Sequence, residues 1–148
     1  MKLIPLAIAA AAGLTMAVQG SLNAALGKVI GLWEATLVVH ALGVAAALLF
    51  FLRLGDGQLA QITRAPWYTL LGGILSVLII YGVATSIPKL GVATATTAII
   101  VGQTLTALFI DHLGCFGLDK VPFTWLKLLG VVFLVAGAFL LLGKSVSS

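Results

Sequence analysis

The chain has 148 residues, of which 61% are hydrophobic and 8% are charged, and its mean hydropathy is +1.23. A soluble domain carries about 25% charged residues, so a water-soluble globule of this composition would expose too much apolar surface. The composition therefore predicts an integral membrane protein. The net charge of +4 comes from residues at the edges of apolar segments or in loops. There it indicates topology and contact with lipid headgroups rather than nucleic-acid binding.

Five apolar segments are long enough to cross a bilayer, because a hydrocarbon core of about 30 Å needs roughly 20 helical residues. The predicted spans are Ile4–Leu26, Trp33–Leu52, Trp67–Ile87, Leu90–Ile110 and Trp125–Gly143. Three of them begin at a tryptophan, whose amphipathic ring favours the headgroup level. We therefore expect a single all-α transmembrane domain over residues 1–148, with five helices and short connections.

Five spans place the two termini on opposite sides of the membrane. The N-terminal side would carry five basic residues and the other side three: Lys2, Arg53, Arg64, Lys120 and Lys127 against Lys28, Lys89 and Lys144. The positive-inside rule weakly favours a cytoplasmic N-terminus. Because the bias is small, insertion in both directions stays open. An inverted pair of chains would have the pseudo-two-fold symmetry of many transporters.

The first span carries Thr15, Gln19 and Asn23, which repeat every four residues and share one helix face. A stripe of small residues, Gly13, Gly20 and Gly27, runs beside that face. Polar side chains at membrane depth face a neighbouring helix or a water-filled cavity. The amides therefore either hydrogen-bond across a helix interface or line the path of a substrate.

The second and third spans each hold polar residues at depth. Glu34 opens the second span, where a carboxylate favours the positive end of the helix dipole or acts as a gate or anchor. His40 lies about two turns deeper, and an imidazole ordinarily titrates near neutral pH, so both a structural hydrogen bond and proton coupling stay open. In the third span, Gly72 and Ser76 predict a helix-packing contact. The Tyr81 hydroxyl needs a structural partner or a cavity.

The fourth span is unusually polar for its length. Thr96 and Gln103 share one face and Thr106 flanks it, which makes them candidates for lining the same path. Asp111 and His112 follow at the end of the span, as a gate, a tertiary anchor or solvated loop residues. The fifth span contains Gly130 and Gly137 seven residues apart and reads as a packing or dimerisation helix.

Nothing in the sequence predicts an enzyme. Asp111, His112 and the single cysteine, Cys115, are too few for a metal site, and no nucleophile lies in a pattern with a base. We therefore expect no catalytic residue, no bound metal and no cofactor.

Four stretches occur together in this chain: QGSLNAALGK at 19–28, PWYTLLGGILSV at 66–77, PKLGVATATTAIIVGQ at 88–103 and IDHLGCFG at 110–117. In this order they resemble the short five-helix EamA-like proteins of the drug/metabolite transporter (DMT) superfamily, the YdcZ-like group once filed as a domain of unknown function. The resemblance covers nearly the whole chain. It implies a protein of the bacterial inner membrane that acts as a half-unit, two halves completing a ten-helix bundle.

The resemblance also implies which polar positions matter: Gln19, Asn23, Gln103, Asp111 and His112 match the family's recurring ones. His40 is supported by its depth alone. Related small multidrug resistance proteins bind cations and exchange protons through a carboxylate in mid-span of their first helix. This chain has Gln19 and Asn23 in its first span instead, which argues against cation/proton antiport by that scheme and leaves room for a neutral or zwitterionic substrate.

Together these features predict a secondary transporter, or half of one, for a small polar metabolite or drug-like solute. The expected path residues are Thr15, Gln19, Asn23, His40, Tyr81, Thr96, Gln103 and Thr106, with Glu34, Asp111 and His112 as gate or anchor. The expected partners are the bilayer, the small-molecule substrate, and a second copy (antiparallel where insertion is dual) or a paralogue, with no nucleic acid. A dual-inserted passive channel and a non-transporting membrane subunit are the alternatives.

Overall fold

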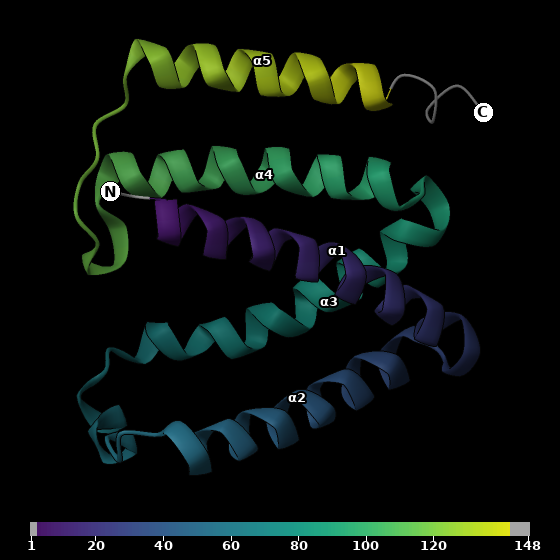
Figure 1. Ribbon diagram of the computed structural model, residues 1–148, viewed down its shortest axis with the longest axis vertical. Coiled ribbons are helices and arrows are strands. Elements are labelled where there is room, and N and C mark those ends of the chain that lie inside the picture. Colours follow the sequence, from purple (N-terminus) through teal and green to yellow (C-terminus); the bar gives the residue numbers. More distant parts are fainter. Residues whose placement is uncertain (1–2, 143–148) are drawn as a thin grey trace. The chain divides into compact units, whose positions relative to one another are not determined.

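The computed structural model describes residues 3–142; Met1, Lys2 and residues 143–148 lie outside this range. The described chain forms five long helices, drawn in Figure 1: α1 (Leu3–Ile30), α2 (Leu32–Leu54), α3 (Leu71–Leu90), α4 (Val92–Leu113) and α5 (Trp125–Leu142). Three short 3-10 helices, η1 (Leu59–Arg64), η2 (Trp67–Leu70) and η3 (Cys115–Gly117), lie in or beside the connections. The five long helices, with η2 continuing into α3, are long and apolar enough to cross a membrane. The predicted all-α fold with five membrane-spanning helices is confirmed.

Several helices end later than predicted. α1 continues past Leu26 to Ile30, and α3 continues past Ile87 to Leu90. Pro88 therefore lies in the last turn of α3, two residues before the helix ends. The third predicted span begins in η2 rather than in an α-helix. The predicted end of the fifth span, Gly143, lies outside the described residues.

Two single glycines separate consecutive helices. Gly31 lies between α1 and α2 with φ 97°, and Gly91 lies between Leu90 and the start of α4 with φ 83°. Residues with a side chain rarely adopt such positive φ values, whereas glycine does so without steric cost. These two glycines therefore mark where the chain leaves helical geometry in the two connections.

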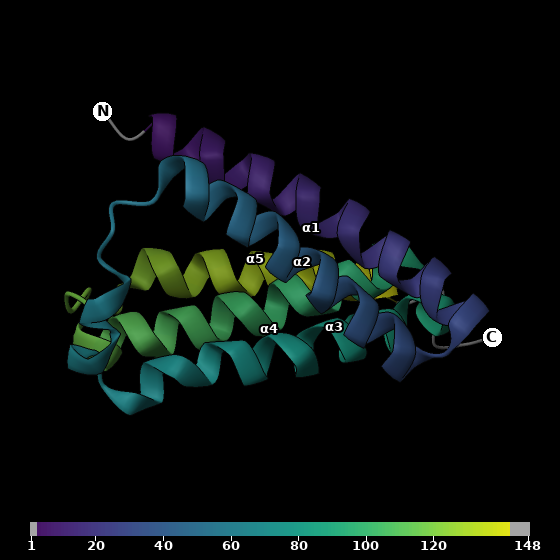
Figure 2. The ribbon, with the colours of Figure 1, turned by 90° about the horizontal axis from the view of Figure 1, so that it is seen from below.

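The described residues fall into two compact units, residues 1–88 and 89–148. In the first unit α1 turns back at Gly31 and packs against α2, as Figure 2 shows. α1 also approaches α3 at Gly20, where a Cβ atom would lie 2.8 Å from Val83 Cγ1 and 3.2 Å from Ile87 Cδ1. Small residues allow this kind of close helix approach in membranes.

In the second unit α4 packs against α5 through an ordered connection. Gly114 adopts the left-handed conformation (φ 64°, ψ 42°) that commonly ends an α-helix, and its N–H donates to the Ile110 carbonyl. The Val121 N–H then donates to the Asp111 carbonyl at 2.8 Å. At the start of α5, the Lys127 N–H donates to Thr124 Oγ1 at 3.3 Å, in the manner of a helix cap.

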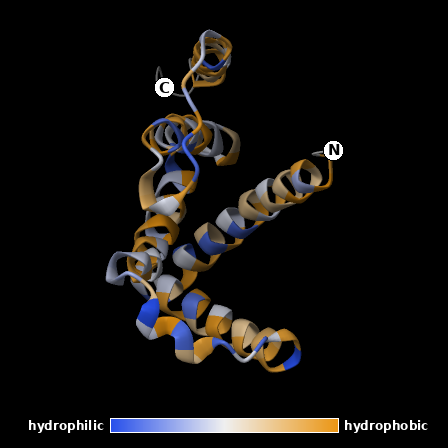
Figure 3. Ribbon diagram, turned by 90° about the vertical axis from the view of Figure 1, so that its left-hand side faces the viewer, coloured by the Kyte–Doolittle hydropathy of each residue, from blue (hydrophilic) through white to orange (hydrophobic). Residues whose placement is uncertain are grey.

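Large apolar side chains cover the outside of the helices, and hydrophobic colours dominate the ribbon in Figure 3. Trp125 is 84% exposed and Leu140 is 81% exposed. The buried hydrophobic residues of the described chain are nearly all alanines: Ala24, Ala35, Ala84, Ile87, Ala95 and Ala138. Lipid tails are as apolar as these side chains, so membrane helices meet through small residues and leave large ones outside.

Candidate functional site

The three residues of the polar face predicted on α1 differ in how exposed they are. Thr15 is exposed, and its Oγ1 donates to the Ala11 carbonyl of the same helix at 2.9 Å. Gln19 is exposed as well. Asn23 is only 6% exposed and lies in the same part of α1 as the buried Gly20 and Ala24. Of the three predicted residues on this face, Asn23 is the one built into the packing.

The Asn23 amide has no hydrogen-bond partner among residues 3–142, although most of its surface is covered. Every fully enclosed side-chain nitrogen or oxygen atom in this range does have a partner. The Asn23 amide atoms must therefore keep access to space outside the packing. An amide can accept two and donate two hydrogen bonds, so Asn23 presents unused hydrogen-bonding capacity.

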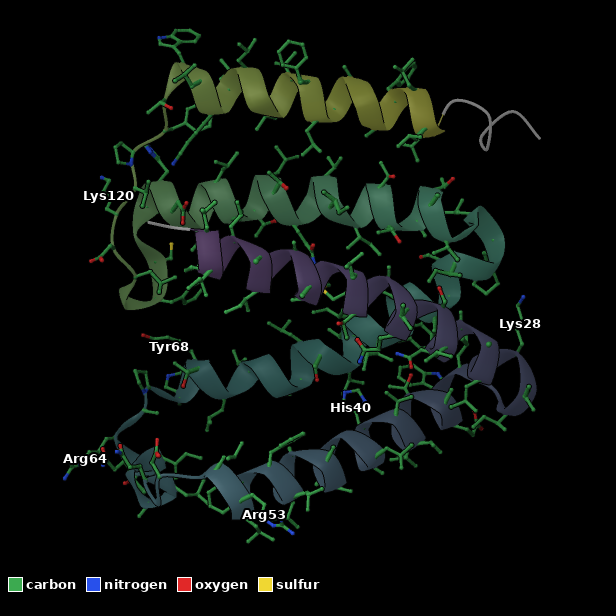
Figure 4. The ribbon with its side chains drawn as sticks, in the orientation of Figure 1. Lys28, His40, Arg53, Arg64, Tyr68 and Lys120 are labelled. Carbon is green, nitrogen blue, oxygen red and sulfur yellow. The ribbon has the colours of Figure 1, made fainter. Side chains whose placement is uncertain are left out.

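His40 joins α2 to α3. Its Nδ1 lies 2.8 Å from the Thr36 carbonyl oxygen, and its Nε2 lies 3.0 Å from Ser76 Oγ. The Ser76 hydroxyl in turn donates to the Gly73 carbonyl at 2.7 Å. Figure 4 shows the imidazole between the two helices, away from Lys28 at one end of this unit and from Arg53 and Arg64 at the other. Ser76, expected only as a packing residue, is thus the partner of His40.

A second contact between α2 and α3 joins Trp33 to Tyr81. Their rings stack with centroids 4.3 Å apart and an interplanar angle of 23°. Trp33 was expected only as an anchor at the headgroup level, and nothing in helical periodicity could have paired it with Tyr81. The stack positions one of the predicted path residues against the first turn of α2.

Glu34 lies in the first turn of α2, and its carboxylate lies over the α-carbon of Gly31. A Cβ atom on residue 31 would collide with the carboxylate, so the glycine is needed for space as well as for its φ. A carboxylate in the first turn is stabilised by the positive end of the helix dipole. This placement suits a helix-start residue, and a gating role for Glu34 stays a prediction.

The polar residues predicted on α4 lie in the second unit. Thr96 is half-buried, whereas Gln103 and Thr106 are exposed. Thr106 Oγ1 donates to the Gly102 carbonyl at 2.9 Å, while the Gln103 amide is exposed on the surface of α4. The buried residues of this helix are Thr94 and Ala95, directly before Thr96. That α4 lines the same path as α1 to α3 stays a prediction.

Asp111 and His112 lie in the last turn of α4 and bind the connection that leads to α5. Besides the bond to the Asp111 carbonyl, the Phe123 N–H donates to His112 Nδ1 at 3.4 Å. His112 also lines a groove of about 610 Å³ between α4 and α5, whose other lining residues are Leu105, Leu108, Phe109, Phe123, Leu128 and Val131. These contacts suit the anchor role, and a gating role stays a prediction. Within residues 3–142, no three His, Cys, Asp or Glu side chains gather to hold a metal ion.

The five apolar helices and their few polar contacts can now be compared with known proteins. Residues 4–140 match a family model described as "Putative inner membrane exporter, YdcZ". The chain belongs to this family. A search of curated proteins and a search of solved structures each returned no match. As a member of the YdcZ-like group of the DMT superfamily, the chain is a multi-pass inner-membrane protein and a transporter rather than an enzyme.

In this YdcZ-family protein the structure brings some of the predicted residues into contact with other helices. His40 and Tyr81, both in the first unit, each contact a residue on the facing helix. Thr15 and Thr106 instead bond to carbonyls of their own helices. Sequence reasoning missed the two partners, Ser76 and Trp33. A serine in a membrane helix is explained by helix packing and a tryptophan by the headgroup level, so neither indicated a contact with His40 or Tyr81.

Proposed function

We propose that this YdcZ-family protein is half of a secondary transporter that moves a small polar, neutral or zwitterionic solute across the inner membrane by alternating access. The family description favours export as the direction. Two copies, inserted in opposite orientations, would form the complete path. Such inverted pairs place their substrate site near the middle of the bilayer.

The observation that carries the proposal is a set of amide side chains on apolar helices. Gln19 and Gln103 are exposed on their helices, and Asn23 is 6% exposed. A polar group left unpaired in hydrocarbon costs several kcal/mol. Amides that donate and accept hydrogen bonds are suited to a polar solute without net charge.

The half-unit follows from the uncovered surface of the helices. In each candidate span, no more than 11% of the most apolar window is buried within the chain. Helices with so little covered surface would leave the exposed Gln19 and Gln103 amides facing lipid. A second copy would cover part of this surface and enclose the amides, as related halves do in inverted-repeat transporters.

Counterflow tests the proposed mechanism. Purified protein is first screened by thermal shift against small polar and zwitterionic metabolites, and each stabilising compound is then tested in proteoliposomes. We expect preloaded unlabelled compound to accelerate uptake of the labelled compound, because a carrier returns faster when loaded. Uptake that does not respond to preloading would show a passive channel. The absence of uptake for every stabilising compound would contradict transport by this protein alone.

Reporter fusions test the inverted pair separately. A cytoplasmic reporter and an external reporter, each fused to the C-terminus, should both give signal if the chain inserts in both directions. Signal from one side only, together with a monomeric particle of five helices, would rule out an inverted homodimer.

A further inference from the structure

The His40–Ser76 contact has a property that the transport proposal does not use. Both ring nitrogens of His40 face an oxygen: the Thr36 carbonyl at 2.8 Å from Nδ1, and Ser76 Oγ at 3.0 Å from Nε2. A carbonyl oxygen accepts and never donates. Nδ1 must therefore carry a hydrogen whenever the contact with Thr36 is a hydrogen bond. This leaves Nε2 as the nitrogen that gains or loses a proton.

Ser76 can serve either state of Nε2. Its Oγ also lies 2.7 Å from the Gly73 carbonyl. When Nε2 carries a proton, it donates to Ser76 Oγ, and the Ser76 hydroxyl donates to Gly73. When Nε2 has lost that proton, the hydroxyl turns and donates to Nε2 instead. Apart from the proton on Nε2, the two states differ only in the direction of the Ser76 hydroxyl hydrogen. Both ring nitrogens keep a hydrogen-bond partner in each state.

We propose that His40 and Ser76 form a reversible proton-binding site that couples movement of the solute to movement of one proton per chain. The coupling role rests on the transport function proposed above, whereas the binding of the proton does not. The proton adds to Nε2 of neutral His40 and leaves from the same atom, so no other bond is made or broken. An imidazole is the side chain that ordinarily changes charge between about pH 5 and pH 8.

The other ionisable groups of the neighbouring helices lie mostly at helix ends. On α1 the described residues include Lys28, in its last turn. On α2 they are Glu34 in the first turn and Arg53 in the last, and on α3 they are Tyr81 and the terminal Lys89. Both ring nitrogens of His40 are occupied by Thr36 and Ser76, so none of these groups is its hydrogen-bond partner.

The proton would act on the α2–α3 contact. A hydrogen bond from a charged donor is shorter and stronger than one between neutral groups. Protonated His40 would therefore hold Ser76, and with it α3, more tightly than neutral His40 does. Since these side chains bridge two different helices, the charge of one ring shifts the balance between a closer and a looser α2–α3 arrangement. Alternating access needs a shift of this kind.

Nitrogen-15 NMR of histidine-labelled protein in lipid nanodiscs tests the binding step without any substrate. The chain has two histidines, and His112→Gln identifies the His40 signals. We expect neutral His40 to carry its hydrogen on Nδ1, and Nε2 to gain a proton when the sample is acidified. A neutral form protonated on Nε2, or no uptake of a proton by the ring on acidification, would overturn the proposal.

Variants of Ser76 test the relay. Ser76→Ala removes the hydroxyl that donates to Nε2 of neutral His40, so the Nε2 resonance of the neutral ring should move toward that of a nitrogen without a hydrogen bond. Ser76→Thr keeps a hydroxyl and should restore the resonance. An unchanged Nε2 resonance in Ser76→Ala would show that Ser76 takes no part.

The coupling step is tested by the distance between α2 and α3. In a Cys115→Ser background, spin labels at Leu52 and Leu70, both exposed near the same end of this unit, report the distance. We expect the mean distance to shift by about 2 Å between pH 5.5 and pH 8.5, and His40→Gln to abolish the shift. A constant distance in the unsubstituted pair would overturn coupling at this contact. Loss of counterflow with the titration and the shift intact would instead contradict the transport proposal.

Discussion

In the unit formed by residues 1–88, polar side chains of different helices contact one another. His40 reaches Ser76, and Trp33 stacks on Tyr81. On α4, in the other unit, Thr97 and Thr106 donate to carbonyls of their own helix, Ala93 at 2.8 Å and Gly102 at 2.9 Å. The spans of both units look polar in the sequence. Between α2 and α3 these polar groups join two helices, whereas the threonines of α4 are satisfied by carbonyls of their own helix.

The difference shows that hydroxyls and amides carry different information in a membrane span. A serine or threonine can donate to a carbonyl one turn earlier and needs no other partner. Thr15 and Thr85 do this as well. The side chains of Gln19, Asn23 and Gln103 have no such bond, so they are the stronger candidates for binding a solute.

The largest effect should come from removing the amides. Asn23→Leu and Gln103→Leu are each expected to lower counterflow by about 5-fold to 150-fold, because a lost hydrogen bond to a buried polar solute costs roughly 1–3 kcal/mol. Thr106→Val is the matched control, since its hydroxyl already bonds within α4, and should retain most of the activity. Counterflow rates are compared after melting curves confirm that each variant is folded. Equal losses in all three would erase the distinction between amides and hydroxyls.

The next effect concerns the close approach of α1 and α3. Gly20→Val should destabilise the protein by about 1–3 kcal/mol, because a Cβ would lie 2.8 Å from Val83 and extra atoms in a packed contact force side chains apart. Gly13→Val is the control, since a Cβ there has no neighbour within 4 Å. Thermal unfolding in detergent measures both. Similar stability in the two variants would contradict the described α1–α3 contact.

A smaller effect is expected from the Trp33–Tyr81 stack. Aromatic pairs contribute about 0.5–1.5 kcal/mol beyond the area they bury, so a double-mutant cycle with Trp33→Leu and Tyr81→Leu should give a coupling energy in that range. The matched control is Trp67, which lies 14 residues before Tyr81 in the same unit and has its ring against Tyr68. The cycle of Trp67→Leu with Tyr81→Leu should give no coupling. A coupling energy near zero for Trp33 and Tyr81 would remove the second contact between α2 and α3.

The smallest effect concerns the connection between α4 and α5. The bond from Phe123 N–H to His112 Nδ1 is long, at 3.4 Å, and exposed. His112→Ala should therefore cost less than about 1 kcal/mol while speeding hydrogen exchange at the Phe123 amide. The Val121 amide, which donates to the Asp111 backbone, serves as the internal control. Unchanged exchange at Phe123 would argue against the anchor role of His112.

The number of helices and their approximate positions could be predicted from the sequence, because the thickness of the hydrocarbon core sets the length of an apolar span. Their ends were harder to predict. The third span was predicted to end at Ile87, just before Pro88, but α3 ends at Leu90 and Gly91 provides the connection. A proline near the end of a helix disrupts few hydrogen bonds, whereas a glycine with positive φ marks where the helix geometry is left.

The contacts between helices could not be predicted in the same way. Helical periodicity places residues on a face of one helix but does not show which residue on another helix lies opposite. The depth of His40 indicated that it needs a partner, and the sequence offered several hydroxyls. Ser76 is the partner because of how α2 and α3 lie against each other at this point, which no pattern within either helix reveals.

The central claim is that two copies build one path, and mixed reconstitution tests it most directly. Wild-type protein and Asn23→Leu are combined in increasing proportions, and counterflow of a stabilising compound is measured at constant total protein. If transport requires two intact copies, equal amounts should give about one quarter of the wild-type rate, because random pairing leaves that share of intact pairs. A rate of about one half, falling linearly with the wild-type fraction, would show that each chain transports alone.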